Sequence, residues 1–189
     1  MTLEEDVLAR LARSLDALGI PYMITGSVAS SFHGRPRSTH DADVVIDPTL
    51  DALRSLVRDL TSAGFYVDAD RAEQALSSRR QFNVIDMASA FKLDLIVRKD
   101  RPFSREELSR RQRSELAGTT VALATAEDTI LSKLEWAKRA GSSERQFADA
   151  RGIVEVRGTN LDHSYIEHWA DALGILDLWQ QISGQSAKP

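Results

Sequence analysis

Two aspartates separated by one residue, Asp41 and Asp43, carry the clearest potential for chemistry in this sequence. They precede an apolar run at residues 44–46, which is typical of a buried strand. Residues two apart in a strand point to the same face, with Cα atoms roughly 6.6 Å apart. Two carboxylates on one face can share divalent cations, as the ligands of two-metal phosphoryl-transfer sites do. Magnesium fits best, because it prefers oxygen ligands and binds together with substrate phosphates.

A third acid, Asp94, lies inside an apolar run at residues 93–97 that predicts an interior strand. A lone acid on such a strand is costly unless it is paired or binds a metal. Asp94 is therefore the expected third metal ligand and a candidate general base. Asp86 competes for this role, but its strand is shorter and less apolar.

Gly26 and Ser27 lie between a predicted strand at residues 22–25 and a predicted short helix at residues 27–32. A turn of this kind presents free backbone N–H groups and the positive end of a helix dipole to a phosphate. The alternative is an ordinary strand–helix turn with Ser27 as the N-cap. Arg37, which precedes the aspartate pair, could contact phosphates or be a solvated loop residue.

The elements around these residues predict an α/β (α+β) fold. Helices are expected at residues 3–18, 50–60 and 106–113, and strands at residues 22–25, 43–46, 65–67, 82–87 and 91–97, with two short strands around a turn within 116–123. After Thr125, an expected N-cap, the pattern is helical at residues 125–140, 144–156 and twice within 163–182. We therefore expect a small mixed sheet in a core at residues 1–124, a helical bundle at 125–182 and a flexible tail at 183–189.

Composition narrows the classes of protein. The chain has no cysteine, which excludes disulfides, thiolate zinc sites and cysteine nucleophiles. The N-terminus is acidic and no apolar run approaches the ~20 residues of a membrane span, so a cytoplasmic protein without membrane contact is expected. The net charge of −4 gives no overall basic footprint for nucleic acid. Residues 98–113 are locally rich in arginine and could meet a phosphate backbone or form a solvated charged helix.

The chain carries four features in this order: Gly26-Ser27, a short helix, the run Arg37-Ser-Thr-His-Asp-Ala-Asp43 and the later Asp94. This arrangement resembles the nucleotidyltransferase superfamily, which has the polymerase-beta-like fold. The helical part is similar to the AbiEii-type branch of nucleotidyltransferase toxins, through the run at residues 125–134, the run at 146–153 and the run at 169–175. One departure is Ser27, since many relatives have a second glycine at that position.

The resemblance implies a role for each matching residue. Gly26 and Ser27 would cradle the triphosphate, and Asp41 and Asp43 would bind both magnesium ions. Asp94 would complete the metal site and help to deprotonate the acceptor hydroxyl.

In the helical part, the resemblance implies that Lys133 reaches the NTP phosphates and that Asp149 orients this lysine or the acceptor. Two structural alternatives stay open. Lys133 could be a boundary lysine that lays its stem on the core, and Asp149 could pair with Arg145 one helical turn away.

The implied activity is magnesium-dependent transfer of NMP from an NTP to an acceptor hydroxyl. By resemblance the first acceptor is RNA, with a tRNA 3′ end as its most specific form, and the role is that of a toxin in a toxin–antitoxin or phage-defence system, with a cognate antitoxin as a possible partner. A small-molecule transferase of the aminoglycoside-modifying type is an alternative, mildly favoured by the negative charge. A protein acceptor and a non-catalytic NTP-binding or antitoxin-like module are the others.

Overall fold

The computed structural model describes residues 3–116, 118–139, 141 and 144–184. The chain forms two compact units, Met1–Thr25 with Thr39–Ala124, and Gly26–Ser38 with Thr125–Pro189. The first unit contains a sheet and helices, and the described residues of the second are helical. The segment Gly26–Ser38 thus groups with the C-terminal helices, whereas the sequence analysis placed it in the core at residues 1–124.

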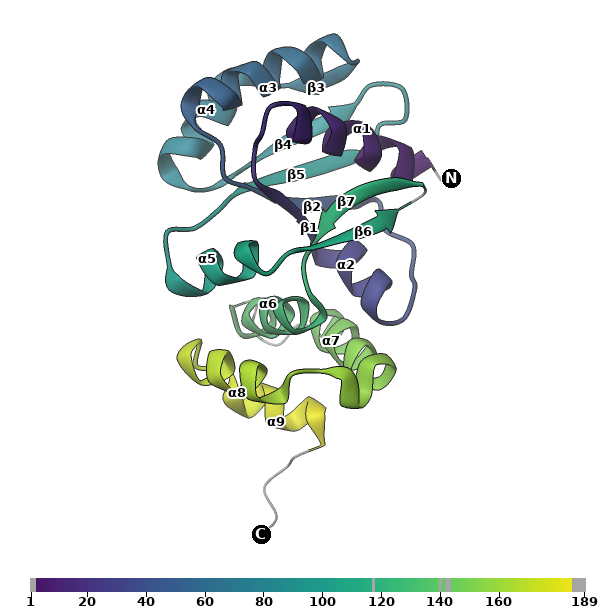
Figure 1. Ribbon diagram of the computed structural model, residues 1–189, viewed down its shortest axis with the longest axis vertical. Coiled ribbons are helices and arrows are strands. Elements are labelled where there is room, and N and C mark those ends of the chain that lie inside the picture. Colours follow the sequence, from purple (N-terminus) through teal and green to yellow (C-terminus); the bar gives the residue numbers. More distant parts are fainter. Residues whose placement is uncertain (1–2, 117, 140, 142–143, 185–189) are drawn as a thin grey trace. The chain divides into compact units, whose positions relative to one another are not determined.

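The first unit is built on a seven-stranded sheet in the order β3-β4-β5-β2-β1-β7-β6 (Figure 1). The strands are β1 (Tyr22–Thr25), β2 (Asp41–Ile46), β3 (Phe65–Val67), β4 (Gln81–Asp86), β5 (Lys92–Val97), β6 (Gln112–Leu116) and β7 (Thr119–Leu123). The sheet is mixed, because β2 is parallel to β5 and β1 to β7 while the other neighbours are antiparallel. The predicted α/β fold with a mixed sheet is confirmed.

Alternation along the central strands separates a buried face from a polar one. Ala42, Val44 and Ile46 of β2 are fully buried, as are Leu93 and Leu95 of β5. Because residues two apart share a face, Asp41 and Asp43 must lie on the opposite face from this core. The alternation of residues therefore puts Asp41 and Asp43 on the face of the sheet opposite the aliphatic core.

Two helices pack on the buried face of the sheet. They are α1 (Leu3–Ala17) and α3 (Leu50–Ser62), whose Leu53, Leu56 and Leu60 have no exposed surface. Arg10 of α1 reaches the strands directly, since it forms an ion pair with Asp86 and lies over the ring of Phe65. The apolar stripes predicted for residues 3–18 and 50–60 thus cover the core.

Two predictions for the middle of the first unit differ from the structure. The helix predicted at residues 106–113 is partly wrong, because α5 (Pro102–Ser109) starts earlier and β6 takes the chain from Gln112. Proline at the first helical position needs no N–H partner, which explains the earlier start. Helix α4 (Ala69–Ser78) was not predicted, because it buries only small residues, Ala72 and Ala75.

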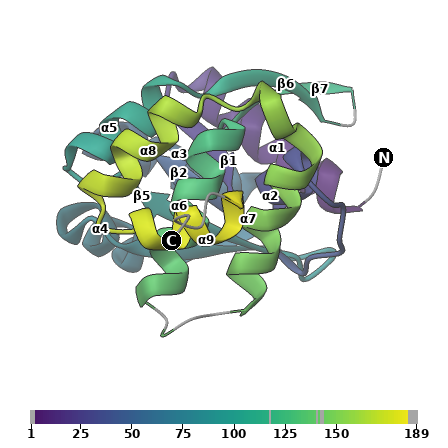
Figure 2. The same ribbon diagram turned by 90° about the horizontal axis from the view of Figure 1, so that it is seen from below.

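The second unit packs α2 (Gly26–His33) against two longer helices, α6 (Ala126–Arg139) and α7 (Glu144–Arg157), which lie side by side in Figure 2. A short 3-10 turn, η1 (Gly158–Asn160), leads to α8 (His163–Ala172) and α9 (Leu176–Ser183). The predicted cap at Thr125 is confirmed, because its Oγ1 accepts a hydrogen bond from the backbone N–H of Asp128 at 3.1 Å.

A glycine allows close contact between α2 and α7. A Cβ atom built on Gly34 would lie 2.8 Å from the backbone nitrogen of Ile153 and 2.9 Å from the carbonyl carbon of Gly152. Real Cβ contacts are longer than this, so no larger residue fits without moving α7. Gly34 therefore fixes how near the loop after α2 approaches α7.

None of the helices in the described ranges is long and apolar enough to span a membrane. Of the expected tail at residues 183–189, residues 185–189 lie outside the described residues.

Candidate active site

The three predicted acidic residues meet on one face of the sheet in the first unit. Asp41 and Asp43 lie on β2, and Asp94 lies on the neighbouring strand β5. In the register of these parallel strands Asp43 is the direct partner of Asp94, and Asp41 is the partner of Lys92. Direct partners share a face of the sheet, so all three carboxylates and the lysine lie together.

The alternative acid, Asp86, serves the structure instead. It lies on the buried side of the sheet, with 2% of its surface exposed, and its carboxylate pairs with Arg10 of α1. The same carboxylate accepts a hydrogen bond at 2.9 Å from the backbone N–H of Ser89, in the turn after β4. Asp94 is therefore the acid that joins Asp41 and Asp43.

Lys92 was missed by the sequence analysis and lies within the acidic group. Its Nζ is 3.0 Å from Oδ2 of Asp94 and 3.8 Å from Oδ2 of Asp41. The hydrogen bond to Asp94 raises the pKa of Lys92 above the ordinary lysine value of 10.5, against the smaller opposing effect of burial. The signal was present in the sequence, because Lys92 is two residues from Asp94 and must share its face.

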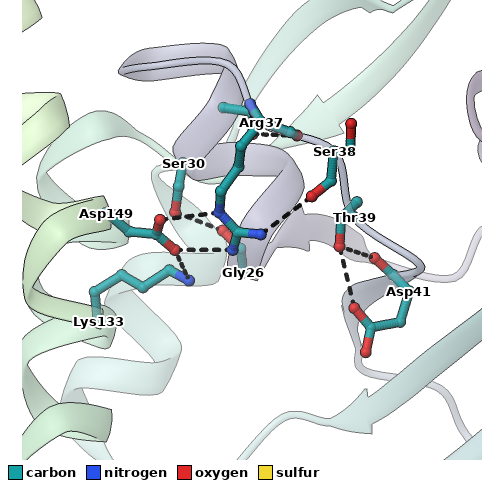
Figure 3. Close-up of polar contacts among 9 residues, drawn as sticks. Gly26, Ser30, Arg37, Ser38, Thr39, Asp41, Lys133 and Asp149 are labelled. Carbon is teal, nitrogen blue, oxygen red and sulfur yellow. Dashed lines mark hydrogen bonds and ion pairs between the residues drawn. The ribbon is translucent and has the colours of Figure 1, made fainter. Parts of the chain in front are cut away.

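Thr39 holds the carboxylate of Asp41 from the preceding loop (Figure 3). Its hydroxyl lies 3.1 Å from Oδ1 of Asp41 and 2.9 Å from the backbone carbonyl oxygen of the same residue. Thr39 is 8% exposed, whereas the side chain of Asp41 is 47% exposed, so a buried hydroxyl holds a carboxylate that faces solvent. The threonine fixes the orientation of a carboxylate at the start of β2.

The acidic group fits a hard divalent cation. Oδ1 of Asp94 is buried and has no hydrogen-bond partner in the described part of the chain, which is unusual for a carboxylate and leaves one oxygen available as a ligand. The ammonium of Lys92 already marks a cation position between two of the acids. Among the described residues, no three acidic or histidine side chains are yet arranged to hold a metal ion. Asp41, Asp43 and Asp94 are the residues that could do so.

A second group of predicted residues meets in the helical unit. Asp149 on α7 accepts two hydrogen bonds from Arg37, from Nε and from Nη2, each at 3.0 Å, and one from Nζ of Lys133 on α6 at 2.8 Å (Figure 3). A bidentate arginine with a lysine on the same carboxylate is a strong, charge-assisted arrangement.

The side chains of this second group are largely buried within the helical unit. The side chains of Lys133 and Asp149 are 8% and 9% exposed, and that of Arg37 is 26% exposed. Burial acts to raise the pKa of Asp149, but the hydrogen bonds and charges of Arg37 and Lys133 outweigh it, so its pKa lies below the ordinary value of 3.8. Of the alternatives left open above, pairing with Arg145 is wrong, since the carboxylate pairs with Arg37 and Lys133.

Gly26 begins α2 with a positive φ of 62°, a conformation that favours glycine. Its carbonyl accepts a hydrogen bond at 2.8 Å from the hydroxyl of Ser30 (Figure 3). Ser27 is buried, with 5% of its surface exposed. Gly26 directly follows Thr25, which is the partner of Asp43 in the sheet.

Part of the positive charge of the segment at residues 98–113 is neutralised within the first unit. Arg98 pairs with Asp47 at 2.8 Å, Arg105 pairs with Asp100, and Arg113 pairs with Asp16 at 3.1 Å. Three of the basic side chains therefore already have acidic partners, which favours the charged-surface interpretation of this segment over a phosphate-binding one.

Comparison with solved structures identifies the fold of the chain. No family profile and no curated protein sequence matches the chain. Among solved structures, the solution structure of the antibiotic-resistance factor ANT(2″)-Ia matches with a TM-score of 0.61 and 13% identity, over 94% of this chain and 97% of that one.

Two further structures agree. A crystal structure of ANT(2″)-Ia in complex with adenylyl-2″-tobramycin has a TM-score of 0.61 and 15% identity, over 92% of this chain and 98% of that one. An antigenic nucleotidyltransferase-like protein from Paracoccidioides brasiliensis has a TM-score of 0.60 and 17% identity, over 98% of this chain and 94% of that one. The chain therefore has the nucleotidyltransferase fold that its acidic motif predicted.

Proposed function

We propose that this protein is a magnesium-dependent nucleotidyltransferase that moves NMP from an NTP to an acceptor hydroxyl. One observation carries the proposal. Asp41, Asp43 and Asp94 lie on one face of two paired strands, and a buried oxygen of Asp94 finds no hydrogen-bond partner among the described residues. Such an oxygen is costly in a folded protein unless a ligand uses it.

The reaction forms one bond and breaks another at the α-phosphorus. The acceptor oxygen attacks this atom, the bond to the bridging oxygen of the β-phosphate breaks, and pyrophosphate leaves. Magnesium, when bound by Asp41, Asp43 and Asp94, would neutralise phosphate charge during this transfer. In this proposal Asp94 accepts the proton of the acceptor hydroxyl, and Thr39, whose hydroxyl lies 3.1 Å from Oδ1 of Asp41, keeps Asp41 oriented.

The helical unit supplies groups for the phosphates. Arg37 and Lys133 carry two positive charges against the single carboxylate of Asp149, so the group keeps a net positive charge that a triphosphate can use. The first turn of α2, opened by Gly26, adds backbone N–H groups suited to a phosphate. The role of Asp149 is to hold the arginine and the lysine in place.

For the acceptor we propose RNA, as the AbiEii-type resemblance implies, with a cytoplasmic toxin restrained by an antitoxin as the biological role. A small-molecule acceptor is the second candidate, since ANT(2″)-Ia, which has the same fold, is seen in complex with adenylyl-2″-tobramycin. A module that binds NTP without turnover is the third.

The proposal is tested with purified protein, magnesium, each α-labelled NTP in turn, and RNA or an aminoglycoside. We expect label to appear in an acceptor with the wild type and to be lost with Asp43→Asn. Asp51→Asn is the matched control, since it removes an exposed carboxylate on α3 of the same unit. Transfer that survives in Asp43→Asn would overturn the proposed site, and NTP binding without transfer to any acceptor would favour the non-catalytic module.

A further inference from the structure

A hollow of about 790 Å³ opens on the first unit between α4 and β4. It is large enough for a small ligand, since such sites typically occupy ~300–1,000 Å³. Tyr66 and Ile85 supply apolar surface, Gln74, Gln81 and Asn83 supply amides, and Asp68, Arg71 and Arg80 supply charge. The active site described above uses none of these residues.

The register of the strands joins this hollow to the acidic face. One row of direct partners runs across four strands from Tyr66 through Ile85 and Lys92 to Asp41. The next row runs from Asn83 through Asp94 to Asp43. Side chains of direct partners lie on one face with Cβ atoms about 5 Å apart, so Asn83 borders Asp94.

The distances suit a substrate that lies in the hollow and reacts at the acids. Neighbouring strands are about 4.8 Å apart, so Tyr66 on β3 lies roughly 10 Å from β5. A group that is bound beside Tyr66 and Asn83 can thus reach Asp94 without leaving the sheet surface.

The chemistry of the lining indicates what the hollow binds. The carboxylate of Asp68 caps α4 and is 3.4 Å from Nε of Arg71, so these two charges offset each other. The exposed guanidinium of Arg80 has no ion pair or hydrogen bond with another described residue. Tyr66 is 55% exposed, which leaves a ring face open for stacking. The surface is therefore aromatic, rich in amides and weakly positive.

We propose that this hollow binds the acceptor, and that the acceptor is the 3′-terminal segment of a single-stranded RNA. A base stacks on Tyr66, the amides of Gln81 and Asn83 meet base or sugar edges, and Arg80 meets a backbone phosphate. The terminal hydroxyl then lies at the Asn83 end, beside Asp94. This inference rests on the proposed function and assigns a site to its acceptor.

The same lining disfavours a polycationic acceptor. An aminoglycoside carries several ammonium groups and needs acidic side chains, whereas the one acid in the lining, Asp68, is already paired with Arg71. Arg80 would repel such a ligand. The hollow thus separates two acceptor classes that the acidic site alone treats alike.

The test measures binding of a 5′-fluorescein-labelled single-stranded RNA with a free 3′ hydroxyl, by anisotropy and without NTP. We expect Tyr66→Ala and Arg80→Gln each to weaken binding about tenfold. Tyr66→Phe keeps the ring and should bind like the wild type. Arg58→Gln on α3 is the matched control, because it removes an exposed arginine outside the hollow and should change binding less than twofold.

Transfer kinetics separate this inference from the proposed function. We expect Tyr66→Ala and Arg80→Gln to raise the KM for RNA about tenfold and to leave the KM for the NTP within twofold. If both variants transfer nucleotide to RNA with the same kinetics as the wild type, the proposed acceptor site is wrong and the proposed function is unaffected. Weakened RNA binding in both variants, without transfer in the wild type, would support the site and overturn the function. If the wild type binds tobramycin tightly and Arg80→Gln binds it more tightly still, the inference is wrong.

Discussion

Lys92 lies where a cation is expected, 3.0 Å from a carboxylate oxygen of Asp94 and 3.8 Å from one of Asp41. In the metal-free protein its ammonium offsets the mutual repulsion of the acids. A metal that binds the same carboxylates must overcome repulsion from this ammonium or displace it. The lysine therefore stabilises the fold without metal and weakens the binding of metal alone.

We predict that Lys92→Met raises the affinity of the NTP-free protein for Mn²⁺ about tenfold. The reason is the loss of one positive charge beside the ligand carboxylates, and a tenfold change corresponds to about 1.4 kcal/mol. The dissociation constant is measured by calorimetric titration with Mn²⁺ as the probe.

The conservative variant Lys92→Arg serves as the control and should bind Mn²⁺ as weakly as the wild type. Unchanged or weaker binding in Lys92→Met would show that the lysine does not oppose the metal.

One physical reason explains why Asp41 and Asp43 could be predicted from the sequence and why Lys92 was missed. Asp41 and Asp43 are neighbours along one strand, so alternation alone places them together. The contact of Lys92 with Asp41 depends on the pairing of β2 with β5, which the local sequence does not encode. The contact of Asn83 with Asp94 likewise depends on the register of β4 with β5, which the local sequence does not encode.

At the scale of elements, Asp149 joins α7 to α6 and to the loop after α2. We predict that Asp149→Asn lowers the free energy of unfolding at pH 7 by about 3 kcal/mol, because it removes the buried carboxylate charge that Lys133 and Arg37 share. Chemical denaturation measures the change. Glu155→Gln on the same helix is the control, since its exposed pair with Arg35 should contribute less than about 1 kcal/mol.

The same variant predicts a pH dependence. The folded-state pKa of Asp149 is lowered, so its contribution to stability is fully present above the ordinary value of 3.8 and is lost as pH falls through the folded-state pKa. The difference in unfolding free energy between wild type and Asp149→Asn should shrink in that acidic range. A difference that stays constant down to pH 3 would contradict the assigned ion pairs.

Two glycines of the second unit give a paired prediction. Gly34→Ala should lower stability by about 1–3 kcal/mol, because its new methyl group meets the backbone of α7 at 2.8 Å. The methyl group of Gly152→Ala meets Arg35 at ordinary contact distances, 3.5 Å from Cγ and 3.7 Å from Cβ and from the backbone nitrogen. Alanine also favours the helix, so stability should stay equal or rise. Thermal unfolding midpoints decide, and equal midpoints for both variants would contradict the close approach at Gly34.

Elements were predictable where an apolar stripe was long or a cap was clear. Helix α3 shows Leu53, Leu56 and Leu60 on one side, and α6 begins at the predicted Thr125. Helix α4 was missed because it has few large apolar side chains, so no periodicity stands out. The first of the two short strands predicted within 116–123 was placed too late, because β6 (Gln112–Leu116) is an edge strand with largely exposed residues and only its pairing with β7 defines it.

At the scale of the whole molecule, the chain leaves one unit and returns to it. In sequence, residues 26–38 lie between strands of the sheet. They nevertheless group in the second unit with the helices that begin at Ala126. Linear changes of composition cannot show such an excursion, because the contacts of Gly34 with α7 connect residues far apart in the sequence. The change after Thr125 from alternating strands and helices to helices alone marked only one of the points at which the chain passes from one unit to the other.

Removal of metal tests the whole molecule at once. We predict that EDTA abolishes nucleotide transfer but leaves the thermal unfolding midpoint unchanged within about 1 °C. The core beneath the acids, which includes Val44, Leu93 and Leu95, is fully buried, and Lys92 offsets the charge of the acids without metal. Magnesium with a non-hydrolysable NTP analogue at about 100 times its dissociation constant should then stabilise the protein by about 2.7 kcal/mol. A fall of several degrees in EDTA would mean that metal belongs to the fold, and transfer that persists in EDTA would separate the acids from the reaction.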